Sequence, residues 1–356
     1  MIMDAARMRR VGRCGASGAM LAVMAACDHA ASTLAQDGSP GTSITQLGWF
    51  LLITAGVVVL IIAVLVPFAA LKRHDAPATL AANGADVQAV DRPREAGENR
   101  WLTTFAILIP AVILTVSFGF TVETIDAVGY PAHRTPASTI IVTGHQWWWE
   151  VSYGDSTGQG FITANEIHIP VGQPVRVKLQ TADVIHSFWV PQLTGKMDVI
   201  PGQNNETWIE ARRAGTFDGP CGEFCGAQHA HMRLRVIAET PEQYASWYAA
   251  QQHPAPAPID SASDVRMGQG FRTFTTAGCA TCHTIRGTSA GGGVGPDLTH
   301  VGSRQMLAAG AVPNTAGGLE AWIADPQGIK PGSDMPRMAV PPQDMPALVA
   351  YLESLK

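Results

Sequence analysis

The sequence contains two long apolar runs, at 47–71 and 101–120, that hold no charged residue. Each run is long enough to cross about 30 Å of hydrocarbon as an α-helix, and a helix satisfies its own backbone hydrogen bonds in lipid. Only 15% of all residues are charged, against about 25% in an ordinary soluble domain. We therefore expect a transmembrane hairpin within residues 28–125 rather than two core helices of a soluble protein.

Basic residues between the two runs predict the orientation of this hairpin. The stretch 28–46 has no Lys or Arg, whereas the loop 72–100 contains Lys72, Arg73, Arg92, Arg94 and Arg100. Short loops rich in Lys and Arg remain cytoplasmic. We therefore expect this loop on the cytoplasmic side of a bacterial-type cytoplasmic membrane. The chain after the second run is expected on the outer side.

The first 27 residues are typical of a secretory signal peptide. Four arginines between positions 7 and 13 precede a short apolar stretch at 15–26, which is too short to span a bilayer. The sequence Met-Ala-Ala-Cys at 24–27 resembles a lipoprotein cleavage site, with Cys27 as the lipidated residue. Plain cleavage near Ala35 is the alternative.

Between about 130 and 245 the pattern changes to short strands. Val175, Val177 and Leu179 alternate with polar residues, which is the period of a half-buried strand. The stretches 138–153, 161–169, 184–190, 206–211 and 233–238 have similar patterns, separated by Gly, Pro, Asn and Asp. We expect a β-sandwich or a Greek-key barrel.

A cluster of soft metal ligands lies in this segment. Cys221, Cys225, His229 and Met232 fall within twelve residues, and thiolate, imidazole and thioether together suit copper. His186, at the end of an apolar strand, is the best candidate for a second imidazole. A Cys221–Cys225 disulfide and a zinc site are the alternatives, but the first leaves His229 and Met232 unexplained and Met is a poor zinc ligand.

These residues resemble subunit II of the haem–copper cytochrome c oxidases. The resemblance rests on the metal loop at 221–232, His-Ser-Phe-Trp-Val-Pro at 186–191, Gly-His-Gln-Trp-Trp-Trp at 144–149 and Lys-Met-Asp-Val-Ile-Pro-Gly at 196–202. It implies a cupredoxin-like Greek-key β-barrel that holds the dinuclear CuA centre. In that centre Cys221 and Cys225 bridge the coppers, His186 and His229 are terminal ligands, Met232 is a weak ligand, and Glu223 binds through its carbonyl.

The same resemblance implies roles for three further side chains. Trp147 matches the aromatic residue through which electrons enter. The Glu223 carboxylate would reach a Mg²⁺ ion shared with subunit I. Glu98 precedes the second span, at a position that marks the entry of a proton pathway in the family. The alternative is that Glu98 is an ordinary charged residue flanking the span.

A Pro- and Ala-rich linker at 246–262 precedes a C-terminal domain at 263–356. Cys279-Ala-Thr-Cys282-His283 has the C-x-x-C-H pattern of covalent haem attachment, with His283 as an axial iron ligand. A Met is the usual second ligand in cytochromes c. The loop 330–336 resembles the distal loop of class I cytochromes c, so Met335 is the candidate and Met338 the alternative.

The prediction is therefore a multi-domain membrane protein: a two-helix transmembrane hairpin, a cupredoxin-like β-barrel and a small all-α cytochrome c domain. By resemblance it passes electrons from a cytochrome c-type donor through haem c and CuA to subunit I, where O₂ is reduced and protons are pumped. Its partners would be subunits I and III, the donor and membrane lipid. A net charge of −5 gives no footprint for nucleic acid. The alternatives are a CuA subunit of a nitric oxide reductase and a copper-binding or copper-delivery protein.

Overall fold

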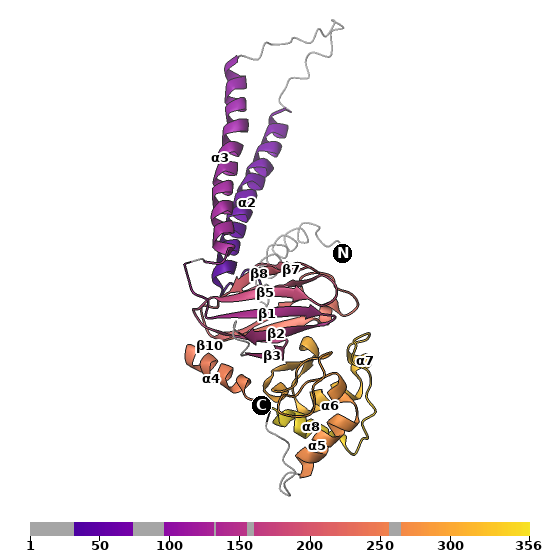
Figure 1. The fold of residues 1–356 in the computed structure, drawn as a ribbon. Helices are drawn as coiled ribbons and strands as arrows, with labels where there is room; N and C mark the ends of the chain where they lie inside the picture. Colours follow the sequence, from indigo (N-terminus) through magenta and orange to yellow (C-terminus); the bar gives the residue numbers. More distant parts are fainter. Residues whose placement is uncertain (1–31, 74–95, 132, 155–159, 256–264) are drawn as a thin grey trace, which may run out of the picture. The chain divides into compact units, whose positions relative to one another are not determined.

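The structure is a computed structural model, and it describes residues 32–73, 96–131, 133–154, 160–255 and 265–356. The signal peptide at 1–27, Cys27, most of the loop 72–100 and the end of the linker lie outside these residues. The chain divides into two compact units, Ser43–Val128 and Met1–Thr42 with Gly129–Lys356. Figure 1 shows the helices and strands of both units.

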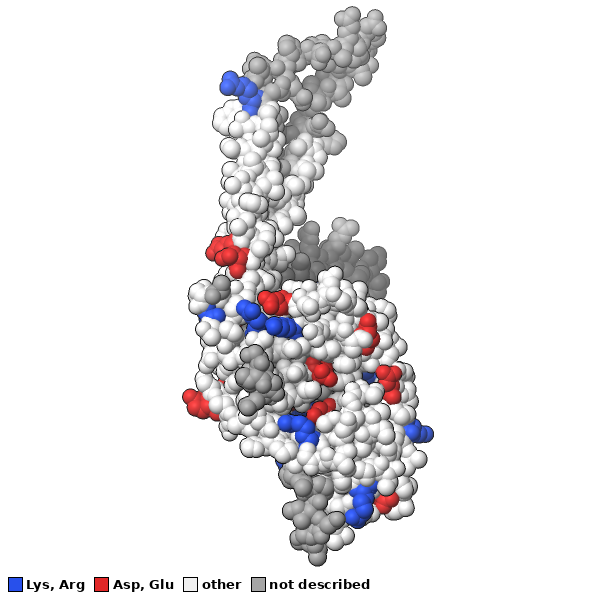
Figure 2. All heavy atoms as spheres, in the orientation of Figure 1, with Lys and Arg blue, Asp and Glu red and all other residues white. Residues whose placement is uncertain are grey.

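The unit Ser43–Val128 contains nearly all of two long helices, α2 (Ser39–Arg73) and α3 (Ala96–Val128). Their apolar side chains face outward: Leu71 and Phe118 are each 70% exposed. Such exposure is what a lipid environment requires. Figure 2 shows no Lys, Arg, Asp or Glu along the middle of these helices. The segments Ser39–Leu71 and Thr103–Val128 are long and apolar enough to cross a membrane.

Both helices extend beyond the apolar runs that predicted them. Helix α2 begins at Ser39 with Pro40 in its first turn, where proline is well tolerated. Helix α3 continues past 120 through Glu123 and Asp126 to Val128. Residues 32–42 belong with the other unit, because Asp37 pairs with Arg213 at 2.6 Å and Gly38 forms a β-bridge with Ala211.

Two sheets form the β domain (residues 133–252). One has the strand order β3-β2-β1-β5-β8, and the other has the order β4-β10-β9. The hairpin β6-β7 lies beside them as a separate pair. The strands are β1 (Ser138–His145), β2 (Trp148–Gly154), β3 (Gly160–Ala164), β4 (Glu166–Pro170), β5 (Val175–Thr181), β6 (His186–Phe188), β7 (Met197–Val199), β8 (Asn205–Ile209), β9 (Gly215–Pro220) and β10 (Arg233–Glu239).

Alternation along the strands builds the core between the sheets. On β5, Val175, Val177 and Leu179 are buried while Lys178 is exposed, which confirms the period-2 prediction. Strand β1 pairs with β5 in parallel and with β2 antiparallel, so it is central to its sheet. The result is the cupredoxin-like β-sheet domain that the sequence predicted.

Helix α4 (Pro241–Gln252) follows the last strand and occupies the first seven residues of the predicted linker 246–262. The helix begins at a capping box, in which Thr240 accepts from the Gln243 backbone and the Gln243 side chain accepts from the Thr240 backbone. Its residue Trp247 stacks on His168 with ring centroids 4.0 Å apart. These aromatic contacts attach the helix to the β domain.

The C-terminal domain (residues 265–356) is mainly helical. Helices α5 (Val265–Thr276) and α8 (Met345–Ser354) cross closely, because a Cβ atom at Gly270 would lie 2.3 Å from the Ala347 carbonyl oxygen. The remaining elements are η3 (Cys279–Thr281), η4 (Val301–Ser303), β11 (Met306–Leu307), η5 (Ala308–Gly310), β12 (Val312–Pro313), α6 (Ala316–Ala324) and α7 (Pro326–Ile329).

Candidate functional site

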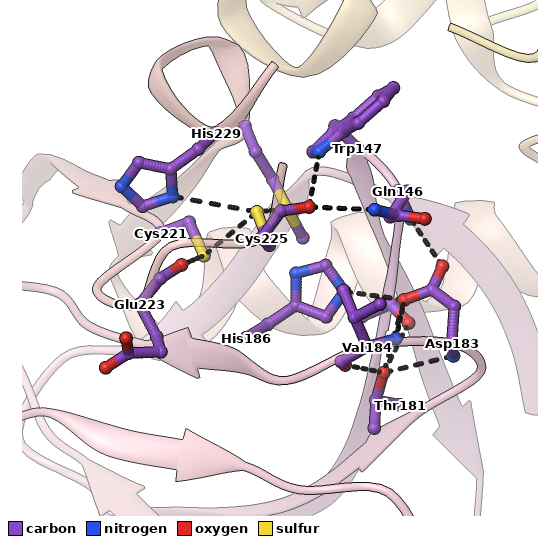
Figure 3. Close-up of polar contacts among 12 residues, drawn as sticks. Gln146, Trp147, Thr181, Asp183, Val184, His186, Cys221, Glu223, Cys225 and His229 are labelled. Atoms are coloured by element: carbon purple, nitrogen blue, oxygen red, sulfur yellow. Dashed lines mark hydrogen bonds and ion pairs between the residues drawn. The ribbon is translucent and has the colours of Figure 1, made fainter. Parts of the chain in front are cut away.

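The loop 221–232 brings two thiols, a thioether and an imidazole together (Figure 3). Its ends are joined by a hydrogen bond from the Cys221 N–H to the Met232 carbonyl, 2.9 Å long. The two Sγ atoms lie 3.9 Å apart, and both thiols are free. The Cys225 Sγ lies 3.6 Å from His229 Nδ1 and 3.8 Å from Met232 Sδ. The spacing is therefore not that of a disulfide.

His186 completes this cluster. It lies on strand β6, outside the loop 221–232. The ligand atoms of His186, Cys221 and Cys225 all lie within 4.8 Å of one another. The His186 ring is buried, and its Nδ1 is a buried atom without a hydrogen-bond partner. Such atoms are rare in folded proteins and call for an explanation.

Asp183 orients the His186 ring. Its Oδ1 lies 2.8 Å from His186 Nε2, and its Oδ2 accepts the Gln146 backbone N–H at 2.6 Å. With Nε2 donating to the carboxylate, Nδ1 keeps its lone pair for a metal, as in other carboxylate–histidine–metal arrangements. Burial lowers the pKa of His186, but Cys221 and Asp183 outweigh burial, so its pKa is raised.

The two thiols affect each other's proton affinity. A hydrogen bond from Cys225 lowers the pKa of Cys221 to about 3, although burial opposes this shift. The hydrogen bond with Cys221 raises the pKa of Cys225 well above the usual value for a thiol, and burial and the charge on Cys221 add to the effect.

The main chain of Cys225 connects this cluster to Trp147. The Cys225 carbonyl accepts the Trp147 indole N–H at 2.9 Å and the Gln146 side-chain amide at 2.8 Å. Gly144 lies behind His186, and a Cβ atom there would lie 2.7 Å from the ring. The absence of a side chain at 144 lets the ring pack against strand β1.

Glu223 presents its carbonyl to the cluster and its carboxylate to solvent. Its carbonyl oxygen lies 3.3 Å from Cys221 Sγ. Its carboxylate is 44% exposed and lies 3.9 Å from Lys196 Nζ. This arrangement leaves the carboxylate free to meet a ligand outside the chain, but a single carboxylate is no complete Mg²⁺ site.

A cavity of about 240 Å³ is lined by Cys279, Cys282 and His283. The Nδ1 of His283 lies 2.7 Å from the Pro296 carbonyl, so Nδ1 donates there and Nε2 retains its lone pair. Burial lowers the pKa of His283, which favours the neutral imidazole that binds metals. A Cβ atom at Gly295 would lie 2.7 Å from this ring.

Three methionines also line this cavity: Met306, Met335 and Met338. Met306 lies on β11 and is 6% exposed. Met335 and Met338 are half-buried and lie in the loop between α7 and α8. Met345 instead packs in the core on α8.

Glu98 lies in the first turn of α3, before the candidate span Thr103–Val128. The structure does not describe its side chain.

Sequence reasoning missed Asp183 and Gln146 as neighbours of the candidate metal ligands. Asp183 stands three residues before His186, and Gln146 stands directly before Trp147. Asp183 contacts both His186 and the Gln146 backbone. The signal for Asp183 was its spacing from a candidate ligand, whereas nothing local pointed to Gln146.

Comparisons with known proteins match this architecture. Residues 159–239 match the family described as cytochrome c oxidase subunit II, periplasmic domain, and residues 268–356 match cytochrome c. Cytochrome c oxidase subunit 2 of Alkalihalophilus pseudofirmus is 37% identical over 272 residues, which cover 74% of this chain and 76% of the relative. The Bacillus subtilis protein of the same name is 29% identical, covering 72% of each chain.

Among solved structures, the periplasmic domain of subunit II of cytochrome oxidase from Bradyrhizobium japonicum is 34% identical. It covers 33% of this chain and 95% of its own, with a TM-score of 0.32.

Proposed function

The chain belongs to the cytochrome c oxidase subunit II family, and we propose that it admits electrons to a haem–copper oxidase through a covalent haem c and a dinuclear CuA centre. Its two family matches imply that it binds copper and haem. The assignment of ligand roles to individual residues rests on the geometry of the site. The relatives' names favour the oxidase over a nitric oxide reductase or a copper-delivery protein.

The buried, unpartnered Nδ1 of His186 is the observation that carries the copper assignment. It faces a set of two thiols, and a second imidazole and a thioether lie beside them. Soft thiolate and thioether ligands with imidazoles suit copper. We assign Cys221 and Cys225 as bridges, His186 and His229 as terminal ligands, Met232 as a weak ligand and the Glu223 carbonyl as a further ligand.

The protein groups at this site suit bound cations. Two thiolates this close together repel each other unless a cation compensates their charge. Bound copper would supply a one-electron store there. The chain's own part is to keep the ligands fixed: Asp183 orients His186, and the hydrogen bond between Cys221 and Met232 closes the loop.

The cavity at Cys279 fits a covalent haem. Both thiols of the C-x-x-C-H motif line it, together with His283, whose ring is oriented by the Pro296 carbonyl. We assign His283 and Met335 as the axial ligands, with Met338 as the alternative. A bound haem would supply one-electron chemistry at this position.

Trp147 is the proposed relay between these centres. It lines the cavity at Cys279, and its indole N–H bonds to the Cys225 carbonyl. The ring thus contacts both the cavity and Cys225, which would hold copper.

The remaining assignments concern the assembled complex. The candidate membrane helices and the match to a periplasmic domain indicate a membrane protein with an outer-facing domain. We propose a bacterial cytoplasmic membrane, subunits I and III as partners, and a cytochrome c-type donor. We also propose a Mg²⁺ ion held by Glu223 with groups of subunit I, proton entry at Glu98, and lipidation at Cys27. The proposed boundaries are 1–27, 28–125, 130–245, 246–262 and 263–356.

Rapid mixing of the oxidised complex with a reduced donor tests this function. The haem c absorption should change first and the copper absorption second, before oxygen is consumed. A copper change that precedes the haem change would contradict the proposed order.

A further inference from the structure

We propose that Lys330 and Glu166 are positioning residues, two buried charges that hold the C-terminal cavity against Trp147 for electron transfer. This inference rests on the proposed function, because it concerns the transfer from haem to copper. Lys330 of the C-terminal domain donates to two backbone carbonyls of the β domain and one of its own domain. Glu166 of the β domain accepts two backbone N–H groups of the C-terminal domain.

Lys330 is buried, with 3% of its surface exposed. Its ammonium donates to the carbonyl oxygens of Trp147 at 2.6 Å, His231 at 2.9 Å and Ala308 at 3.1 Å. Two of these carbonyls belong to the β domain and one to the C-terminal domain. Burial lowers the pKa of Lys330 to about 7, yet three acceptors call for three N–H donors, which only the ammonium provides.

Glu166 makes the reciprocal contact from strand β4. It is 3% exposed, and its Oε1 accepts the backbone N–H groups of Gln305 at 2.7 Å and Met306 at 3.0 Å. Met306 lines the cavity at Cys279. The carboxylate therefore fixes the wall of that cavity from the β-domain side.

The turn after Lys330 lies against the same aromatic ring. Gln228 of the β domain donates to the Pro331 carbonyl at 2.7 Å. A Cβ atom at Gly332 would lie 4.0 Å from the Trp147 ring. The loop that leads to Met335 thus begins in contact with Trp147, and Lys330 is the residue that anchors it.

Burying these two charged side chains costs free energy, and we explain this cost by a need to fix the relative position of the two domains. A buried charge loses its hydration, and only well-placed hydrogen bonds restore part of that free energy. Among the described residues, no carboxylate forms an ion pair with Lys330. All its partners are main-chain oxygens. The three hydrogen bonds can therefore form together only when the backbones of Trp147 and Ala308 lie at the right distance from each other. The ammonium thus specifies one docked geometry rather than a general attraction.

The test compares electron transfer from haem to copper in the full-length chain and in Lys330→Met, after a brief pulse of reductant. Methionine keeps the length of the side chain but removes the charge and all three donors. Three hydrogen bonds from a charged donor are lost and the domains are no longer held in place, so we expect transfer to slow by at least about tenfold. The haem and copper potentials should stay unchanged.

A second readout separates positioning from general damage. Once the domains are no longer held together, transfer should depend on their diffusion and slow as solvent viscosity rises, whereas the unaltered chain should show no such dependence. Lys356→Met, at an exposed lysine of the same domain, is the matched control and should transfer at the original rate.

Glu166→Ala keeps the test valid if Lys330→Met does not fold, and it should also slow transfer and make it viscosity-dependent. Glu166→Gln retains an acceptor oxygen and should be affected less. A variant that folds, binds both cofactors and transfers at the original rate would overturn the proposal. If the unaltered chain itself passes no electron from haem to copper, the proposed function fails instead.

Discussion

Replacing Asp183 by Asn should weaken the copper site without touching a copper ligand. The carboxylate accepts from the His186 ring at 2.8 Å and from the Gln146 backbone at 2.6 Å. A single amide oxygen cannot replace both carboxylate oxygens, so at least one charge-assisted hydrogen bond is lost. Such a bond is worth about 1.5–3 kcal/mol. Loss of a group that orients a ligand typically costs about 10–100-fold in metal affinity.

Chelator competition on the full-length chain, followed by the copper absorption, measures this affinity. Asp218→Asn is the matched control, because its side chain is 42% exposed and pairs with Arg235 on the surface. A surface pair of this kind contributes at most about 1 kcal/mol, and copper affinity should not change. Equal copper affinity in Asp183→Asn and the unaltered chain would refute the argument for Asp183.

The pH dependence gives an independent check on the same residue. Burial raises the pKa of Asp183, but hydrogen bonds from His186, Val184 and Gln146 outweigh burial, so its pKa is lowered. A lowered carboxyl pKa stabilises the fold above the ordinary value of about 3.9, and that contribution is lost as pH falls through the lowered value. The difference in unfolding free energy between the metal-free forms should therefore shrink in acid. A constant difference would contradict this explanation.

Three further predictions follow from particular contacts. Gly144→Ala places a Cβ atom 2.7 Å from the His186 ring, so copper affinity should fall at least about tenfold; an unchanged titration would show that the ring can move. Glu210→Gln removes a carboxylate that Arg134 bonds at 3.0 and 2.8 Å and should cost about 1–3 kcal/mol at neutral pH. Burial raises the pKa of Glu210 but Arg134 outweighs it and the pKa is lowered, so this cost, measured by denaturant unfolding, should disappear in acid rather than persist. Met335→Leu should lower the haem reduction potential and remove the absorption band of Met ligation, while Met338→Leu should preserve both; the reverse result would make Met338 the ligand.

Features that depend on local spacing could be predicted from the sequence. The uncharged runs predicted α2 and α3, and the alternation around Val177 predicted a half-buried strand. The Cys221–Met232 loop and the Cys279–His283 motif each place their ligands within a few residues. The structure then brought His186 to the loop from a separate strand, as the residue types had suggested.

Features that depend on long-range contacts could not be predicted in this way. Lys330 reaches Trp147 across 183 positions of sequence, and no local pattern indicates a carbonyl partner. The Pro- and Ala-rich stretch predicts a linker from 246, but residues 246–252 belong to helix α4. The capping box at Thr240 and the stacking of Trp247 on His168 decide the structure there. The roles of Asp183 and Gln146 likewise emerge only when the turn before β6 comes together with the residue that follows β1.

Metal and haem analysis of the purified full-length chain tests the central claim most directly. The proposed roles of Cys221 and Cys225 and the C-x-x-C-H motif predict two coppers and one covalently bound haem per chain. They also predict that Cys225→Ser abolishes the mixed-valence copper spectrum while leaving the haem in place. A single copper per chain, or a Cys225→Ser variant that retains that spectrum, would contradict the account.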